Sequence, residues 1–214
     1  SFSSDGTLEN AKILGARIYD REFDNFAAKR NYALDEIEFQ HDWVLHLDAD
    51  EVVTEELVAE ISDIVKCNQF VAYKIPSKLI FQGKWLRYSG MYPVYQVRLG
   101  RKDKLKFNQV GHGQRESLDS ISVGTLNNAY LHYGFSKGLL DWIERHNRYS
   151  TDEAKENVSR RDSEAMSFSG LLSSDRTERR RTVKILVSRM PFRPVLRFIY
   201  MYIFRGGFLD GRAG

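Results

Sequence analysis

The sequence of 214 residues contains a single cysteine, Cys67, so no disulfide bond can form within the chain. There is also no cysteine cluster that could hold a structural zinc ion. The first residues, SFSSDGTLEN, lack the basic region and apolar core of a secretory signal peptide. These absences are typical of a protein in a reducing compartment, and we expect the bacterial cytoplasm.

Long hydrophobic runs are missing as well. The most apolar stretch, residues 194–204, is interrupted by Arg197, and a membrane-spanning helix needs about 20 apolar residues. Its aromatic and arginine side chains instead predict an amphipathic helix that lies on an anionic membrane surface. The predicted membrane contacts are Arg193, Arg197, Phe198, Tyr200 and Phe204. A terminal helix packed on the domain or on a second subunit would explain the same pattern.

The net charge of +3 conceals an asymmetry along the chain. Residues 176–214 carry ten basic and two acidic residues, whereas residues 1–175 carry 22 basic and 27 acidic residues. A basic tail on an acidic body favours an anionic partner, either a membrane surface or nucleic acid. Because the arginines alternate with long aliphatic side chains and no nucleic-acid motif is present, we expect the membrane surface and no nucleic acid.

Helix and strand patterns alternate along the chain and predict an α/β fold. The expected helices run from Ser4 or Asp5 to Leu14, from Asp24 or Asn25 to Ile37, from Thr54 to about Lys66, and from Ser136 towards Val158. The expected strands lie at residues 16–19, 43–47, within 70–99 and at 128–133, with a polar loop at 102–120. We expect a mixed, mainly parallel sheet flanked by helices.

Three parts follow from this pattern. We expect residues 1–158 to form the α/β domain, residues 159–182 a mobile polar linker, and residues 183–214 a basic amphipathic helical segment. A doubly wound nucleotide-binding unit begins with a strand, a helix and a second strand. This chain opens directly on a helix cap, so we expect its first β-α unit to be absent.

An acidic cluster, Asp48, Asp50 and Glu51, follows the predicted strand in the sequence DWVLHLDADE. Residues two apart on a strand share a face, so the carboxylates of Asp48 and Asp50 are expected to lie side by side. Two adjacent carboxylates repel one another unless a cation neutralises them, and oxygen ligands suit Mg²⁺ or Mn²⁺. The alternative is that the acids only favour the start of the next helix.

Several segments together resemble family 2 glycosyltransferases with the GT-A fold. DWVLHLDADE resembles that family's Asp-x-Asp motif, SFSSDGT its segment after the second strand, and FDNFAAKRNYAL its A-x-x-R-N helix. Downstream, YPVYQVRLGRKDKLKF, VGHGQRE and LHYGFSKGLLDWIERHNRYSTDEA resemble a bacterial subgroup similar to lipopolysaccharide core β-glucosyltransferases and exopolysaccharide glycosyltransferases. The chain departs from the family in lacking the first strand and helix, which carry part of the base-recognition pocket.

The resemblance implies a metal-dependent, inverting hexosyltransferase. It would transfer a hexose from a nucleotide-diphosphate sugar, expected to be a UDP-sugar, to a lipid-linked, lipopolysaccharide or exopolysaccharide acceptor. The implied location is peripheral, at the inner face of the cytoplasmic membrane. The nearest rival among enzymes is a sugar-phosphate nucleotidyltransferase, which would need a glycine-rich N-terminal loop with a lysine. A non-enzymatic module that binds an anionic surface or nucleic acid through the arginine-rich tail is the rival from another class.

Residue roles follow from the same resemblance. Asp50, Asp48 and His132 are the implied ligands of Mn²⁺ or Mg²⁺, and Glu116 is the implied base that deprotonates the acceptor hydroxyl. His112 and Arg115 would orient that base or bind the acceptor. The implied donor-binding residues are Asp5, Lys29, Arg30, Asn31, Asp48, Ser89 and Gly90. Without the resemblance, His132 reads equally well as a buried core residue, Asp5 as a helix cap, and Lys29–Asn31 as a solvated helix face.

Overall fold

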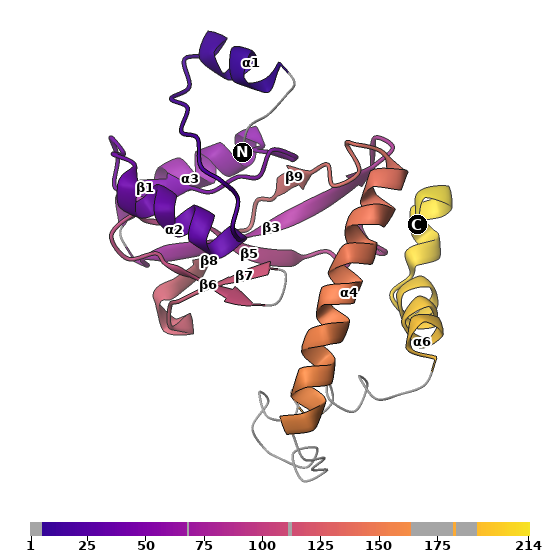
Figure 1. The fold of residues 1–214 in the computed structure, drawn as a ribbon. Helices are drawn as coiled ribbons and strands as arrows, with labels where there is room; N and C mark the ends of the chain where they lie inside the picture. The colour runs from indigo at the N-terminus through magenta and orange to yellow at the C-terminus, as the bar shows by residue number, and fades with distance from the viewer. Residues whose placement is uncertain (1–5, 68, 111–112, 164–181, 183–191) are drawn as a thin grey trace.

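A computed structural model describes residues 6–67, 69–110, 113–163, 182 and 192–214. Its centre is one sheet in the order β1 (Trp43–Leu45), β5 (Val94–Arg101), β3 (Ala72–Phe81), β9 (Tyr130–His132) and β2 (Glu51–Val52). Strands β4 (Lys84–Trp85) and β8 (Val123–Thr125) also pair with β3, and β6 (Phe107–Val110) and β7 (Gly113–Glu116) form a separate hairpin. The α/β class predicted from the sequence is therefore confirmed (Figure 1).

Helices surround this sheet. They are α1 (Thr7–Ile13), α2 (Phe26–Glu36), α3 (Glu55–Cys67), the long α4 (Leu139–Ser163) and, near the C-terminus, α6 (Arg193–Ile199). Helix α6 continues into the π-helix η3 (Tyr200–Phe204) and is followed by the 3₁₀ helix η4 (Gly207–Ala213), while η1 (Ser120–Ser122) precedes β8. No helix within the described ranges has both the length and the apolar character needed to cross a bilayer.

The prediction of a mainly parallel sheet is wrong. Among the described strands, β3 is parallel to β8 and β9, but the pairs β1–β5, β3–β5, β3–β4 and β2–β9 are antiparallel. Residues 43–47 were expected to form one strand of that mainly parallel sheet, but strand β1 within them is antiparallel to β5. An apolar run identifies a buried strand, but the direction of its neighbour depends on a connection that local pattern does not encode.

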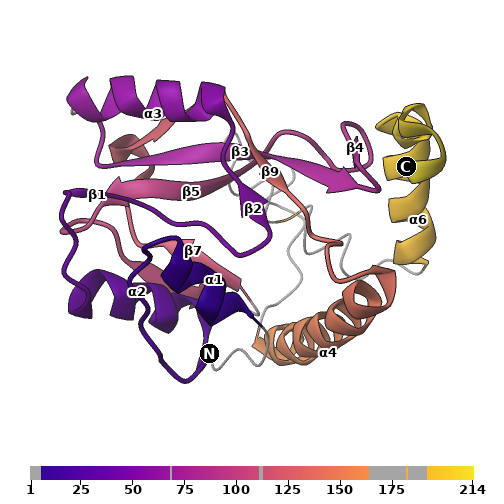
Figure 2. The ribbon, with the colours of Figure 1, turned by 90° about the horizontal axis from the view of Figure 1, so that it is seen from above.

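Two hydrophobic clusters hold the layers together. Helix α2 contributes Ala27 and Leu34 to one cluster, where they join Val44, Val97 and Phe107 from the strands. Helix α3 packs on the other cluster, which joins Leu57 to Tyr73, Ile75, Leu99, Leu126 and Tyr130. Figure 2 shows the sheet between α3 on one side and α2 with the β6–β7 hairpin on the other. Both faces of the sheet are thus covered, which fixes its edges and loops in place.

Two of the helix starts predicted from side-chain caps, those of α2 and α3, are confirmed. The Asn25 side chain accepts a hydrogen bond from the Ala28 N–H at the start of α2, and Thr54 Oγ1 accepts one from the Leu57 N–H at the start of α3. Helix α1 begins at Thr7 after Gly6, and the predicted caps Ser4 and Asp5 lie outside the described residues.

Four other expectations need correction. Residues 16–19 form no strand, and they follow a helix, α1, that buries none of its residues. The predicted polar loop at 102–120 contains the β6–β7 hairpin, because the short strands of FNQV and GQRE pair with one another. Helix α4 starts at Leu139, after Gly138, instead of at Ser136. It also continues to Ser163, so the first residues of the predicted linker at 159–182 are helical.

Candidate functional site

Asp48 and Asp50 lie in a turn between two strands, and Glu51 is the first residue of the second strand. Strand β1 ends at Leu45, and β2 begins at Glu51. The turn is closed by the Glu51 N–H, which donates to the Asp48 carbonyl at 3.0 Å, and by the Asp48 N–H, which donates to Glu51 Oε2 at 2.9 Å. The predicted strand alternation of Asp48 and Asp50 is therefore wrong, although both side chains line the same cavity.

A β-bulge brings an arginine to this turn. Tyr73 of β3 lies opposite Leu99 of β5, whereas the next residue, Lys74, lies opposite Val97, so Arg98 is the extra residue on β5. A bulge leaves its extra residue unpaired in that ladder and can redirect the side chain. Arg98 is only 3% exposed, and its guanidinium contacts the carboxylates of Asp48 and Glu51.

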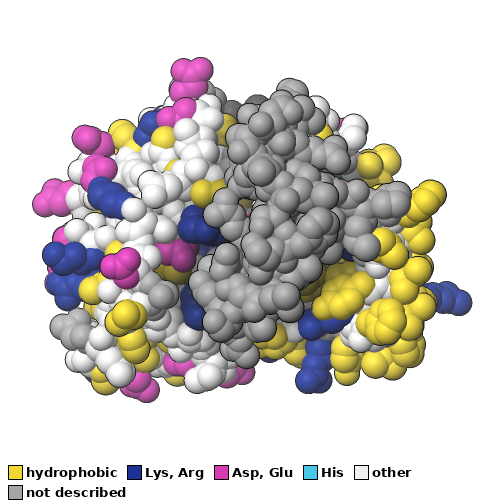
Figure 3. Space-filling model, turned by 90° about the horizontal axis from the view of Figure 1, so that it is seen from below, with side chains coloured by type: hydrophobic (Ala, Val, Ile, Leu, Met, Phe, Trp, Pro, Cys, Tyr) yellow, Lys and Arg dark blue, Asp and Glu magenta, His cyan; other side chains and the backbone are white. Residues whose placement is uncertain are grey.

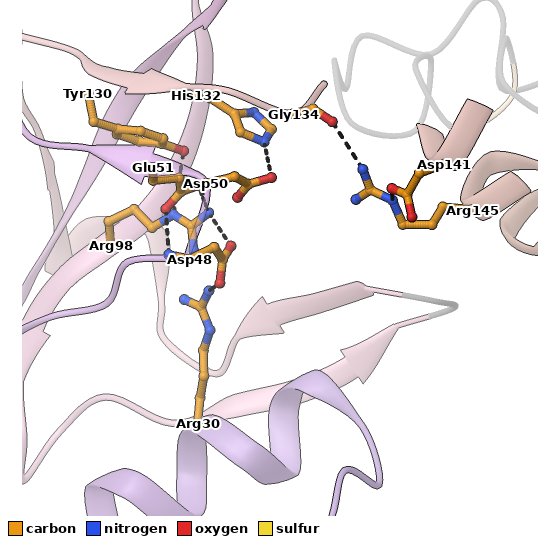
Figure 4. Close-up of polar contacts among 10 residues, drawn as sticks. All are labelled: Arg30, Asp48, Asp50, Glu51, Arg98, Tyr130, His132, Gly134, Asp141 and Arg145. Atoms are coloured by element: carbon orange, nitrogen blue, oxygen red, sulfur yellow. Dashed lines mark hydrogen bonds and ion pairs between the residues drawn. The ribbon is translucent and has the colours of Figure 1, made fainter. Parts of the chain in front are cut away.

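Two guanidinium groups neutralise Asp48 (Figure 4). Arg98 Nη2 lies 2.9 Å from Asp48 Oδ2, and Arg30 Nη2 of helix α2 lies 2.9 Å from Asp48 Oδ1. Burial by itself raises the pKa of the Asp48 carboxyl, but Arg98 and Arg30 outweigh burial and hold that pKa below its usual value. The structure thus pairs Asp48 with two arginines where the sequence predicted a metal ion.

Asp50 and His132 form the second pair at the site. His132 lies at the end of β9, and its Nε2 is 3.5 Å from Asp50 Oδ2 (Figure 4). The interaction with His132 lowers the pKa of Asp50, and the same interaction raises the pKa of His132. The backbone supports the pair, because the Tyr133 N–H donates to the Asp50 carbonyl at 2.7 Å.

Glu116 reaches the same cavity from the β6–β7 hairpin. With its amide oriented to satisfy its neighbours, Gln114 accepts a hydrogen bond from Arg30 Nε at 2.7 Å. Alternate residues of a strand point to the same face, so the Glu116 side chain lies on the Arg30 side of β7 together with Gln114. Arg115 is exposed and also lines the cavity. Arg30 therefore connects the hairpin that carries Glu116 to the Asp48 turn.

The cavity between these elements has a volume of about 780 Å³, within the range of roughly 300–1,000 Å³ that small-molecule sites occupy. Asp48, Asp50, His132 and Glu116 all line it. Helix α4 also lines the cavity, through Trp142, Arg145, His146 and Tyr149. The site is therefore concave, and it combines four ionisable side chains from three separate segments with an aromatic wall.

Ring stacking and an arginine fix helix α4 beside the sheet. Phe135 stacks on Trp142 at 5.2 Å between ring centroids, and Trp142 stacks on His146 at 3.8 Å. Arg145 donates to the Gly134 carbonyl and pairs with Asp141 at 2.8 Å. These contacts join helix α4 to the segment that follows His132. They therefore fix the position of the α4 aromatic side chains relative to the Asp50–His132 pair.

The remaining predicted donor residues fall in different surroundings. Lys29 is exposed and does not line the cavity. The Asn31 amide exchanges two hydrogen bonds with the backbone of Phe107, at 2.8 and 2.9 Å, and so ties α2 to β6. Gly90 lines the cavity, whereas the Ser89 hydroxyl donates to Asp210. Asp5 and His112 lie outside the described residues.

The predicted membrane contacts lie on the C-terminal helices and expose large apolar side chains. Phe198 is 62% exposed and Phe204 is 77% exposed, and Tyr200 and Ile203 are also open to solvent. Figure 3 shows hydrophobic side chains gathered on the side of the molecule where these helices lie in Figure 1, with Lys or Arg side chains beside them. Arg193 and Arg197 belong to the same helix, α6.

Sequence reasoning missed Arg98 and Asp210. A charged residue directly between two apolar residues, Val97 and Leu99, within a predicted strand indicates a buried cation that requires an acidic partner. The sequence therefore contained a signal for the burial of Arg98. It contained no signal for the β-bulge that directs the Arg98 side chain. Asp210 is 3% exposed and stands in a glycine-rich terminal segment, where no local pattern indicates burial.

Comparison with known proteins finds similarity to glycosyltransferases. The chain matches no protein-family model. It is 28% identical over 169 residues to an uncharacterized glycosyltransferase of Rickettsia typhi, an alignment that covers 73% of this chain and 56% of the relative. It is 29% identical over 171 residues to one of Rickettsia conorii, covering 74% and 59%. Over 84 residues it is 32% identical to one of Rickettsia prowazekii, covering 38% and 28%.

The chain thus spans little more than half the length of the relatives that it matches over its longest alignments. The mixed sheet with flanking helices is compatible with a glycosyltransferase fold. These similarities support a relationship of the chain to glycosyltransferases.

Proposed function

We propose that this chain carries the catalytic site of a GT-A, family 2 glycosyltransferase. It would transfer a hexose from a nucleotide-diphosphate sugar to a glycan or glycolipid acceptor, with inversion at the anomeric carbon and assistance from Mn²⁺ or Mg²⁺. The observation that carries the proposal is that the Asp50–His132 pair and Glu116 open into one cavity of about 780 Å³. The similarity to glycosyltransferases of Rickettsia supports the same reaction class.

The residues present fit a cation that the donor helps to bind. Two atoms that each lie about 2.1 Å from one ion can be at most about 4.2 Å apart, and Asp50 Oδ2 and His132 Nε2 are 3.5 Å apart. Across the part of the chain that the structure describes, no three His, Cys, Asp or Glu side chains gather to hold an ion by themselves. Mg²⁺ commonly takes one or two carboxylates and completes its shell with substrate phosphates and water.

Each residue at the site has a defined part in the proposed reaction. Asp50 and His132 would hold the ion, which would supply positive charge to stabilise the departing diphosphate. Asp48, oriented by Arg30 and Arg98, accepts hydrogen bonds from the donor ribose. Glu116 accepts the proton of the acceptor hydroxyl while that oxygen forms its bond to the anomeric carbon. The bond between the anomeric carbon and the diphosphate oxygen breaks on the opposite face, and its electron pair leaves with the nucleoside diphosphate.

Titration calorimetry with UDP, in the presence and absence of Mn²⁺, tests the donor site. We expect binding that requires Mn²⁺, and we expect Asp50→Ala to abolish the metal-dependent part. Asp63→Ala is the matched control, because Asp63 is an exposed aspartate on α3 that does not line the cavity. If the wild-type protein and Asp50→Ala bind UDP equally with and without Mn²⁺, the proposed cation site is wrong.

The role of Glu116 is tested separately from donor binding. Glu116→Gln keeps the size of the side chain but removes its capacity to accept a proton, so we expect unchanged UDP binding and a loss of sugar transfer of about 10²-fold or more. The readout is release of UDP from a UDP-sugar in the presence of acceptor glycolipid. Wild-type turnover in Glu116→Gln would contradict the assignment of the base.

We also propose that the enzyme acts at the inner face of the cytoplasmic membrane of a bacterium. The exposed aromatic side chains of α6 and η3, with Arg193 and Arg197 beside them, have the composition of interfacial helices. An anionic bilayer surface complements this mixture, since the rings enter the headgroup region and the guanidinium groups pair with lipid phosphates. A surface-bound enzyme is suited to a lipid-linked acceptor.

A further inference from the structure

A buried carboxylate outside the acidic turn connects the C-terminus to the cavity wall. Asp210 lies in the 3₁₀ helix η4 and is 3% exposed. It contacts the loop between β4 and β5, more than 120 residues earlier in the sequence. Neither the acidic turn nor the proposed base uses this residue.

The Asp210 side chain binds three successive backbone N–H groups of that loop. Asp210 Oδ1 accepts from the Arg87 N–H at 3.2 Å, and Oδ2 accepts from the N–H groups of Tyr88 and Ser89 at 3.0 and 2.8 Å. The Ser89 hydroxyl donates to the same oxygen at 2.8 Å. Burial by itself raises the pKa of the Asp210 carboxyl, but these hydrogen bonds outweigh burial and hold that pKa below its usual value. One ionised side chain therefore accepts hydrogen bonds from three successive backbone N–H groups and one hydroxyl.

The next residue of the loop, Gly90, lines the cavity. A Cβ atom at Gly90 would lie 2.3 Å from the Leu86 carbonyl oxygen, so the turn passes too closely over its own start to accept any other residue. The wall of the cavity at this point is bare backbone, which lets a ligand approach closely. Its position depends on the turn that Asp210 holds.

The C-terminal segment also contacts the loop beyond Gly90. Arg205 donates to the Tyr92 carbonyl at 3.4 Å, and Arg197 Nη2 lies 3.8 Å from Met91 Sδ. On the other side of the loop, Lys84 donates to the Asp210 carbonyl at 2.6 Å. The loop is therefore held before and after Gly90 by the segment whose outer side exposes Phe198 and Phe204.

We propose that Asp210 is a positioning residue for substrate binding, and that it fixes the Arg87–Gly90 turn as one wall of the cavity. The wall faces the ligand that fills the cavity, which is a nucleotide sugar if the proposed function is correct. The C-terminal segment thus shapes the substrate site from behind in addition to presenting an apolar surface. The carboxylate, and not merely a side chain of the same size, is required, because four donors converge on its two oxygens.

Hydrogen exchange measured by mass spectrometry on Asp210→Asn tests the turn itself. The amide has one acceptor oxygen in place of two, so we expect the amides of residues 87–89 to exchange about ten-fold faster or more. Glu60→Gln is the matched control, since Glu60 accepts from the N–H groups of Asn127 and Asn128 in a loop that does not line the cavity. Thermal unfolding verifies that both variants are folded. Unchanged exchange at residues 87–89 in folded Asp210→Asn would overturn the proposal.

Calorimetry with UDP-glucose and Mn²⁺ tests the link from the turn to the ligand. We expect Asp210→Asn to weaken binding about five-fold or more, as losing preorganisation does, and Glu60→Gln to bind like wild type. Faster exchange without weaker binding would overturn the role in substrate binding. If the wild-type protein binds neither UDP nor UDP-glucose, the proposed function fails. Hydrogen exchange, which needs no ligand, still decides whether Asp210 holds the wall.

Discussion

At the scale of single residues, arginine side chains of the protein itself offset the repulsion among the carboxylates of the site. Arg98 contacts both Asp48 and Glu51, and Arg30 contacts the other oxygen of Asp48. Asp50, the third acid of the cluster, pairs instead with His132, whose charge depends on pH. The turn can therefore fold before any ligand arrives, and the Asp50–His132 pair is the part that a metal ion and a diphosphate can still use.

Replacing Arg98 measures how strongly this arrangement contributes to stability. Arg98→Met leaves the Glu51 carboxylate buried without its partner, and we expect a loss of about 3–5 kcal/mol in the free energy of unfolding. Urea denaturation followed by circular dichroism provides the measurement. Lys66→Met is the control, because the Lys66–Asp63 pair is exposed on α3 and should contribute less than about 1 kcal/mol. Equal losses in both variants would show that the buried Arg98–Glu51 pair contributes no more to stability than an exposed ion pair.

Asp210 gives a prediction for pH. Its folded-state pKa is lowered, so its contribution to stability is fully present above the pKa of an unfolded aspartate, about 3.9, and is lost as the pH falls below that value. We expect the difference in stability between wild type and Asp210→Asn to be constant from pH 7 to about 5 and to shrink in more acidic solution. Urea titrations at a series of pH values measure this difference. A difference that grows on acidification has the wrong sign and would contradict an ionised Asp210.

At the scale of elements, local signals predicted local structure. Asn25 and Thr54 marked the starts of α2 and α3 because a capping side chain acts within its own turn. The antiparallel pairing of β1 with β5 depends on residues more than 50 positions apart, and no pattern within β1 encodes it. The bulge at Arg98 arises from a mismatch between two strands, so it is invisible in either strand alone. The sequence therefore singled out the acidic residues, Arg30 and Glu116, but not Arg98, which pairs with Asp48 and Glu51.

The cap of α2 connects element and site, because α2 carries Arg30. Asn25→Ala removes the hydrogen bond from the Ala28 N–H, and we expect a loss of about 1 kcal/mol in the free energy of unfolding. Asn147→Ala makes the same change at an exposed position inside α4, where alanine favours the helix by a few tenths of a kcal/mol. Chemical denaturation compares the two variants. A neutral Asn25→Ala would mean that tertiary packing alone determines where α2 begins.

At the scale of the whole molecule, the cavity and the apolar surface are built from shared parts. The C-terminal segment exposes aromatic side chains on one side and holds the Arg87–Gly90 turn through Asp210 on the other. Deleting the segment would therefore disturb both properties at once. A test of membrane binding has to change the exposed rings and leave Asp210 in place.

The double variant Phe198→Asp/Phe204→Asp meets that requirement. Burying one phenylalanine is worth about 1.5–3 kcal/mol, so removing two rings should lower partitioning onto phosphatidylglycerol liposomes by at least about ten-fold. Flotation of protein with liposomes measures this partitioning. Ile121→Asp is the control, because Ile121 is 88% exposed but lies in η1, away from α6 and η3 in the sequence. It should float like wild type.

Lipid charge and salt separate the two contributions to this binding. Each arginine near an anionic surface adds about 1 kcal/mol, so wild-type flotation should fall on uncharged phosphatidylcholine and at high salt, where charges are screened. The double variant should keep this salt dependence at a lower level of binding, because its arginines are intact. It should also bind UDP like wild type, because the Asp210 contacts are untouched. Equal flotation of the double variant and wild type on anionic liposomes would contradict the proposal that these rings bind a membrane surface. A protein partner would then be the alternative ligand of the exposed rings.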